Sequence, residues 1–209
     1  MEERLIILGA DNFAREVSQW VNDVYKKNPT HKFVGFLSVN NDVADALHAQ
    51  VIGSAELYTP FSNDKFICGI SEPSLKRDAV NKLLNKGAQF INIIHPTANI
   101  AQKCTIGNGV VVFPFATISA NTYVGNFVTV LFSGMGHDAI AEDYVTIGSG
   151  CDITGGVIIK EAANIRAGSV IIPHKTIGAN STVEMGSVVI RNVQPESVVA
   201  GNPARRKKL

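Results

Sequence analysis

The chain has 209 residues, of which 45% are hydrophobic and 18% are charged. Lysine and arginine number 19 against 18 aspartates and glutamates, and the resulting net charge of +1 excludes the strongly basic surface typical of nucleic-acid-binding proteins. Apolar runs such as 5–8 and 110–113 are far shorter than the roughly 20 residues that span a bilayer, so we expect no membrane span. Three cysteines without metal-ligand spacing are typical of reduced thiols, and we expect a cytoplasmic protein without a secretion signal.

The first part of the chain alternates strand patterns with helix patterns. Residues 5–8 are predicted to form a short buried strand, and apolar residues between Phe13 and Val24 fall on one face of a helix. Further strands are predicted at 32–37, 65–70 and 89–94. Such alternation predicts a small, mainly parallel α/β sheet over residues 1–95.

A second helix is predicted between the last two of these strands. Ser74 is a suitable N-cap, and Gly87 follows the last turn. Leu75 and Leu84 lie at the two ends of its apolar pattern, so we expect both leucines on the apolar face of the helix.

From Asn99 onward the pattern repeats every six residues. Fourteen of the fifteen positions in this register are Ile or Val: Ile100, Ile106, Val112, Ile118, Val124, Val130, then (after Ala141) Ile147, Ile153, Ile159, Ile165, Ile171, Ile177, Val183 and Val189. A second register, four residues later, holds small residues at all but Lys175, and it includes Cys104 and Cys151. This double repeat predicts a β-solenoid whose core is filled by β-branched side chains, with small residues beside them.

The bends of this solenoid carry two further features. If three hexads make one triangular coil, the coils stack at the strand spacing of about 4.8 Å. Each inward residue is followed by a bend, and we expect positive φ at four glycines that stand there, Gly107, Gly125, Gly148 and Gly178. The repeat loses one residue between Val130 and Ala141, around Gly136-His137-Asp138. Function is expected to override the folding rule at such a break.

Several motifs give the chain a family resemblance. They are the hexapeptide run, Gly136-His137-Asp138, Gly155-Gly156, the terminal Gly201-Asn202-Pro203-Ala204-Arg205, residues 9–17 and Ile94-His95-Pro96. Over nearly its whole length the chain resembles the NeuD-like family of sialic acid O-acetyltransferases and nucleotide 4-amino-sugar N-acetyltransferases. The resemblance implies a Rossmann-like sugar- or nucleotide-binding domain (1–95), a left-handed parallel β-helix acyltransferase domain (96–209) and a homotrimer.

The same resemblance implies an acetyl-CoA-dependent transferase acting on an amino sugar, in the first place a nucleotide-linked 4-amino sugar, in bacterial surface-glycan biosynthesis. His137 would be the general base, because a neutral imidazole can accept a proton from the attacking amine. Asp138 would orient the imidazole, and the N–H of Gly155 would stabilise the oxyanion. A solvated His–Asp pair in an exposed turn would have the same sequence.

For the acetyl-CoA co-substrate, the resemblance points to Thr146, Ala167 and Met185 beside Gly155, mostly through their backbone groups, at a site between neighbouring subunits. These three are also ordinary solenoid positions. No metal is expected, because only His137 and His174 fall within the repeats and a zinc site of three histidines needs one more.

For the sugar, the resemblance points to the loop after the first strand, with Asp11, Asn12 and Phe13, and to Ser38 and Ser71 after later strands. The chain departs from the family pattern here, because Asp11 and Asn12 replace the usual glycines. The Asp11 carboxylate would repel a pyrophosphate unless it contacts the sugar, ribose or base.

Two alternatives stay open at the level of the sequence. A sugar O-acetyltransferase of the sialic acid type would use the same base on a hydroxyl group. A non-catalytic trimeric sugar-binding scaffold would keep the solenoid only for assembly. Release of the CoA thiol with amine, hydroxyl or no acceptor distinguishes the three.

Overall fold

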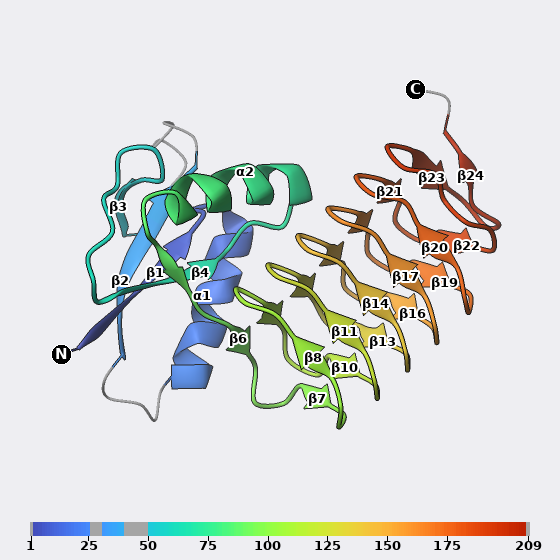
Figure 1. The fold of residues 1–209 in the computed structure, drawn as a ribbon, viewed down its shortest axis with the longest axis horizontal. Helices are drawn as coiled ribbons and strands as arrows, with labels where there is room; N and C mark the ends of the chain where they lie inside the picture. Colours follow the sequence, from blue (N-terminus) through green and yellow to red (C-terminus); the bar gives the residue numbers. More distant parts are fainter. Residues whose placement is uncertain (1, 26–30, 40–49, 208–209) are drawn as a thin grey trace.

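The computed structural model describes residues 2–25, 31–39 and 50–207, and it places an α/β part against one end of a long solenoid (Figure 1). The α/β part is a five-stranded parallel sheet of order β3-β2-β1-β4-β5. Its elements are β1 (Glu3–Leu8), α1 (Asn12–Tyr25), β2 (His31–Ser38), β3 (Val51–Ser54), β4 (Asp64–Cys68), α2 (Pro73–Leu84) and β5 (Gln89–Phe90). The predicted parallel sheet is confirmed.

The two helices cover opposite faces of this sheet. Val17 and Val21 of α1 pack with the odd-numbered residues of β1, whereas Ala79 and Leu83 of α2 pack with the even-numbered ones. The alternation follows from the two-residue period of a strand. The strand predicted at 89–94 is divided, because β5 belongs to this sheet and the next pair, β6, belongs to the solenoid.

The prediction for α2 was wrong in its start and at both ends of its buried face, while Ala79, Val80 and Leu83 between them are buried. The N-cap position is Glu72, without a side-chain cap, and Pro73 opens the helix, as its fixed φ favours. Leu75 and Leu84 are 39% and 40% exposed, while Lys76 is fully buried. Residue 76 faces inward because α2 also packs against the solenoid, which the helix pattern alone does not reveal.

The solenoid has three walls of short parallel strands. Wall 1 consists of β6 (Ile93–Ile94), β9 (Val111–Val112), β12 (Thr129–Val130), β15 (Thr146–Ile147), β18 (Asn164–Ile165), β21 (Thr182–Val183), β23 (Val198–Ala200) and the antiparallel β24 (Arg205–Arg206). Wall 2 consists of β7 (Asn99–Ile100), β10 (Thr117–Ile118), β13 (Gly134–Met135), β16 (Asp152–Ile153), β19 (Val170–Ile171) and β22 (Val188–Val189). Wall 3 consists of β8 (Thr105–Ile106), β11 (Tyr123–Val124), β14 (Ile140–Ala141), β17 (Ile158–Ile159) and β20 (Thr176–Ile177). The triangular coil is confirmed.

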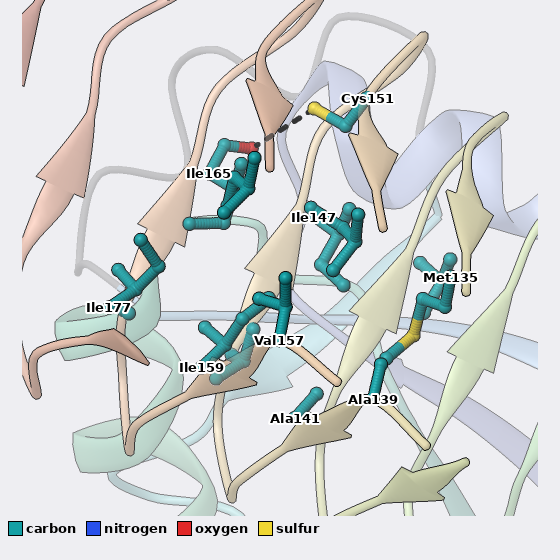
Figure 2. Close-up of a cluster of buried hydrophobic side chains, with 14 of the residues drawn as sticks. Met135, Ala139, Ala141, Ile147, Cys151, Val157, Ile159, Ile165 and Ile177 are labelled. Atoms are coloured by element: carbon teal, nitrogen blue, oxygen red, sulfur yellow. Dashed lines mark hydrogen bonds between the residues drawn. The ribbon is translucent and has the colours of Figure 1, made fainter. Parts of the chain in front are cut away.

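The predicted inward residues form one continuous core. Figure 2 shows side chains from all three walls, among them Ile147, Met135 and Ile159, meeting inside the solenoid. Cys151 is buried among them, and its thiol lies 3.8 Å from the carbonyl oxygen of Ile165. Each coil therefore rests on the aliphatic side chains of the coils next to it.

The missing residue lies in the bend between β12 and β13. Thr129 pairs with Val111, which is 18 residues earlier, but with Thr146, which is only 17 residues later. Met135 takes the inward position in β13 and is 1% exposed. The break therefore lies one bend before His137.

The prediction of positive φ at Gly107, Gly125, Gly148 and Gly178 was wrong. Positive φ falls at the third residue after the inward one, for example at Asp138 (φ 58°), Gly156 (66°) and His174 (59°). The four glycines are needed because neighbouring coils approach closely. A Cβ on Gly148 would lie 2.7 Å from the backbone nitrogen of Ala167.

The α/β part rests on the first coils of wall 1. From α1, Trp20 packs edge-on against Phe113 and Phe132, with ring centroids 5.9 and 6.3 Å apart. On the α2 side, Phe127 stacks on Tyr144 at 5.4 Å. These two aromatic clusters bury both ends of the interface. In the ranges described, no helix is long and apolar enough to cross a membrane.

The close approach of the coils gives a stability prediction. Gly148→Ala should lower the thermal midpoint by several degrees, because its methyl group meets backbone of the next coil and overpacking of this kind costs about 1–3 kcal/mol. Gly134→Ala is the matched control, because a Cβ there meets nothing within 4 Å and φ is not positive. Equal midpoints for the two variants would contradict this account of the glycines.

Candidate active site

The bends that follow wall 2 bring His137 and Asp138 together. Nδ1 of His137 lies 2.7 Å from Oδ2 of Asp138, and both side chains are exposed, at 69% and 58%. The left-handed backbone at Asp138 turns its carboxylate back onto the preceding ring. This is the regular conformation of the bends, so the turn does not depend on the missing residue, which lies one bend earlier.

The carboxylate of Asp138 fixes the tautomer of His137. The hydrogen bond with His137, and then that from Nδ2 of Asn121 at 3.2 Å, lower the pKa of Asp138 below its usual value. A carboxylate can only accept, so Nδ1 carries the proton and Nε2 is left as the basic nitrogen. Asn121 sits one coil earlier at the same bend position, and sequence reasoning missed it.

The pair Gly155-Gly156 makes room for two imidazoles. A Cβ on Gly155 would lie 2.6 Å from Nε2 of His137, and a Cβ on Gly156 would collide with Nδ1 of His174. Backbone hydrogen bonds also join these three successive coils: Gly156 N–H donates to the carbonyl of His137, and His174 N–H donates to the carbonyl of Gly155. Within the described part of the chain, the N–H of Gly155 has no acceptor.

The expected substrate-binding residues gather at the carboxyl edge of the parallel sheet, which we call the acceptor edge: Asp11, Asn12, Phe13, Ser38 and Ser71. Asp11 caps α1, with Oδ1 accepting from Ala14 N–H at 2.9 Å. Asn12 accepts a hydrogen bond from Arg15, and Phe13 stacks on Phe113 at 5.7 Å.

Ser38 is buried, and its hydroxyl lies 3.4 Å from the carbonyl oxygen of Gly53. Ser71 presents its carbonyl oxygen to the solenoid. The hydroxyl of Thr146 donates to that oxygen at 2.7 Å.

Thr146 belongs to a buried polar contact between α2 and wall 1. Nζ of Lys76 donates to the hydroxyls of Thr129 (3.0 Å) and Thr146 (2.8 Å) and to the carbonyls of Phe127 (3.0 Å) and Val145 (3.3 Å). Burial lowers the pKa of Lys76 to about 8. The hydroxyl of Thr146, an expected CoA contact, is thus already used inside the protein.

Ala167 and Met185 lie on a different corner, in the bends that follow wall 1. Three exposed glycines with positive φ stand there one above another: Gly150, Gly168 and Gly186. A Cβ on Gly186 meets nothing within 4 Å, and Met185 is 69% exposed. We call these five residues the glycine ridge; it is a bare strip of backbone open to a ligand.

The structure therefore distributes the expected residues over separate places. It joins His137, Asp138 and Gly155, it gathers the acceptor edge, and it sets Ala167 and Met185 on the glycine ridge. No hydrogen bond or ion pair among the described residues links His137 to the acceptor edge. Over the same residues, no group of three His, Cys, Asp or Glu side chains is arranged to hold a metal ion.

The buried lysine gives a pH prediction. In the unfolded chain a lysine has a pKa near 10.4. Between about pH 8 and pH 10.4, Lys76 is therefore protonated in the unfolded chain but largely neutral in the folded protein. This difference makes the free energy of unfolding rise with pH. The thermal midpoint of the wild type, measured relative to Lys76→Met, should therefore rise from pH 8 to pH 10. The difference in thermal midpoint between the wild type and Arg77→Ala, which loses only an exposed ion pair with Glu161, should not change between pH 8 and pH 10.

Comparison with known proteins extends over the whole chain. No family model matches the sequence. GDP-perosamine N-acetyltransferase of Escherichia coli O157:H7 is 30% identical over 215 residues, which cover 97% of this chain and 95% of that protein.

Many solved structures share the fold, among them the following two. PerB of Caulobacter crescentus in complex with CoA and GDP-perosamine has a TM-score of 0.87 at 24% identity, covering 98% of this chain and 97% of that one. The acetyltransferase domain of PglB from Neisseria gonorrhoeae has a TM-score of 0.88 at 22% identity, covering 99% and 100%.

Proposed function

Because this chain belongs to the left-handed β-helix family of hexapeptide-repeat nucleotide amino-sugar N-acetyltransferases, we propose that it transfers the acetyl group of acetyl-CoA to the amine of a nucleotide-linked amino sugar. The observation that carries the chemistry is the His137–Asp138 pair, with its basic nitrogen against Gly155. An exposed, oriented imidazole beside a free N–H suits an attack on a thioester carbonyl.

In the proposed reaction, the sugar nitrogen attacks the thioester carbonyl carbon and forms the new C–N bond. Nε2 of His137 takes a proton from the nitrogen, and the Asp138 carboxylate stabilises the imidazolium that results. The N–H of Gly155 donates to the oxyanion. When the C–S bond breaks, the CoA sulfur leaves and His137 returns the proton to it, so the base is regenerated.

Acetyl-CoA supplies the activated acyl group, and the glycine ridge is our candidate for its binding. The three stacked glycines leave backbone uncovered beside Ala167 and Met185, and an extended pantetheine arm needs such a strip. The hydroxyl of Thr146 is bound to Lys76 and Ser71, so any contact of Thr146 with CoA would use its backbone.

We infer that the N-terminal sheet is Rossmann-like and binds the nucleotide sugar at the acceptor edge. Its strand order corresponds to the 3-2-1-4-5 order of doubly wound sheets, which bind ligands at the carboxyl ends of their strands. The Asp11 carboxylate occupies the N-terminus of α1, where such folds hold phosphate. We therefore assign Asp11 to the hydroxyl groups of the sugar or ribose.

We further propose a homotrimer with active sites between subunits. His137 lies in a bend that follows wall 2, whereas the glycine ridge lies in the bends that follow wall 1, and Gly150 donates to the carbonyl of Phe132 beside the α/β part. A neighbouring copy would bring the histidine of one chain to the ridge and acceptor edge of another. The three free cysteines suit the reducing cytoplasm, where we place the reaction as a step in bacterial surface-glycan synthesis.

The activity test follows thiol release from acetyl-CoA, with GDP-perosamine as the first acceptor. His137→Ala should lower kcat/KM by roughly 10²–10⁴-fold, because it removes the base, and should leave the thermal midpoint unchanged. Asp138→Asn should lower it too, because an amide can donate to Nδ1 and so no longer holds the proton there. Full activity of His137→Ala would refute the role of this residue.

The acceptor series separates the alternatives. Release with hydroxyl sugars but not amino sugars would favour an O-acetyltransferase. No release with any sugar, and no thermal stabilisation by CoA, would favour a sugar-binding scaffold.

The shared site has its own test. His137→Ala chains co-expressed with Asp11→Trp chains, whose acceptor edge is filled, should regain activity in mixed trimers. One chain then supplies the histidine and another the acceptor edge. A monomeric mass in sedimentation, or no recovery in mixed assemblies, would contradict the shared site.

A further inference from the structure

Lys76 is a buried cation that the proposed reaction does not use. It is fully buried, and its ammonium group is surrounded by four neutral oxygens of wall 1. Among the residues that the structure describes, no carboxylate lies within ion-pair distance of it. Burying such a charge is costly, and an apolar side chain of similar size often serves stability equally well. Its directional hydrogen bonds call for another explanation.

A relay of hydrogen bonds runs from this ammonium group to the acceptor edge. The hydroxyl of Thr146 accepts from Lys76 at 2.8 Å and donates to the carbonyl oxygen of Ser71 at 2.7 Å. One coil further along wall 1, Nδ2 of Asn164 donates to the Glu72 carboxylate at 3.2 Å. Residues 71 and 72 are therefore attached to two successive coils of the solenoid.

The loop that contains Ser71 is also tied to the loop of Asp11. A Cβ on Gly9 would lie 2.6 Å from the carbonyl oxygen of Gly69, and Gly69 N–H donates to Leu8 O at 2.8 Å. With no space between them, the two loops cannot shift independently. A displacement of Ser71 is therefore transmitted to the residues after β1.

We propose that Lys76 is a positioning residue, which fixes the acceptor edge relative to the solenoid through Thr146 and Ser71. This inference rests on the proposed function, because it assumes that the acceptor binds at this edge. The amine has to reach a thioester held by the solenoid, and a misplacement of about 1 Å can cost 100-fold in rate. A rigid hydrogen-bonded anchor meets this requirement, whereas an apolar contact would allow sliding.

The test compares Lys76→Met with Arg77→Ala in the full chain. Methionine keeps the volume and removes the donor, while Arg77 is the neighbouring α2 residue and contacts Glu161 and Asn180, away from the loop. Steady-state kinetics with acetyl-CoA and GDP-perosamine would give kcat and both KM values. Hydrogen exchange would report on the backbone of residues 69–72.

In Lys76→Met we expect kcat/KM for the acceptor to fall about tenfold or more, an acetyl-CoA KM within twofold of the wild type, and faster exchange at residues 69–72. In Arg77→Ala we expect all three to stay at wild-type values. A folded Lys76→Met variant with unchanged exchange, or with both KM values raised equally, would overturn the proposal.

Thr146→Val decides the question if Lys76→Met does not fold. It leaves the ammonium group three of its four partners and removes the donor to Ser71, so the same pattern is expected and the same outcomes would overturn it. If the wild type releases no thiol with GDP-perosamine, the proposed acceptor fails separately. Hydrogen exchange at residues 69–72 then tests by itself whether Lys76 stabilises this loop.

Discussion

The structure depends on how closely successive coils of the solenoid approach at their bends. Gly148 and Gly125 lie against backbone of the next coil, and backbone hydrogen bonds and aliphatic side chains fix the distance between coils. A side chain at the left-handed position of a bend has to project outward. His137 and Asp138 lie in such a bend, so the proposed base is oriented before any substrate binds.

Much of this fold could be predicted because its core repeats. A β-branched residue every six positions, from Ile100 to Val130 and again from Ile147 to Val189, fixes which side chains point inward and therefore how the strands align. The conformation of single glycines could not be predicted in this way. Gly148 and Gly150 stand two residues apart, one because of close approach and the other because of positive φ, and both look alike in a sequence.

The candidate site was likewise predictable only in part. His137 and Asp138 were found because they are adjacent and stand near the break in the repeat, although the break lies one bend earlier. Lys76 was missed because lysine is usually exposed, and its partners Thr129 and Thr146 are 53 and 70 residues away in the chain. Leu75 was misplaced for the same reason, since the solenoid as well as the sheet decides which side chains of α2 are buried.

The break in the repeat also shows how this scaffold tolerates a change of length. The residue is absent from a bend, so β13 and every later strand still pair with their neighbours, and the walls continue undisturbed. Bends can thus absorb deletions, and by the same geometry short insertions, without moving the strands. Proteins with this fold can therefore change the length of individual surface bends while the packing of the solenoid core stays the same.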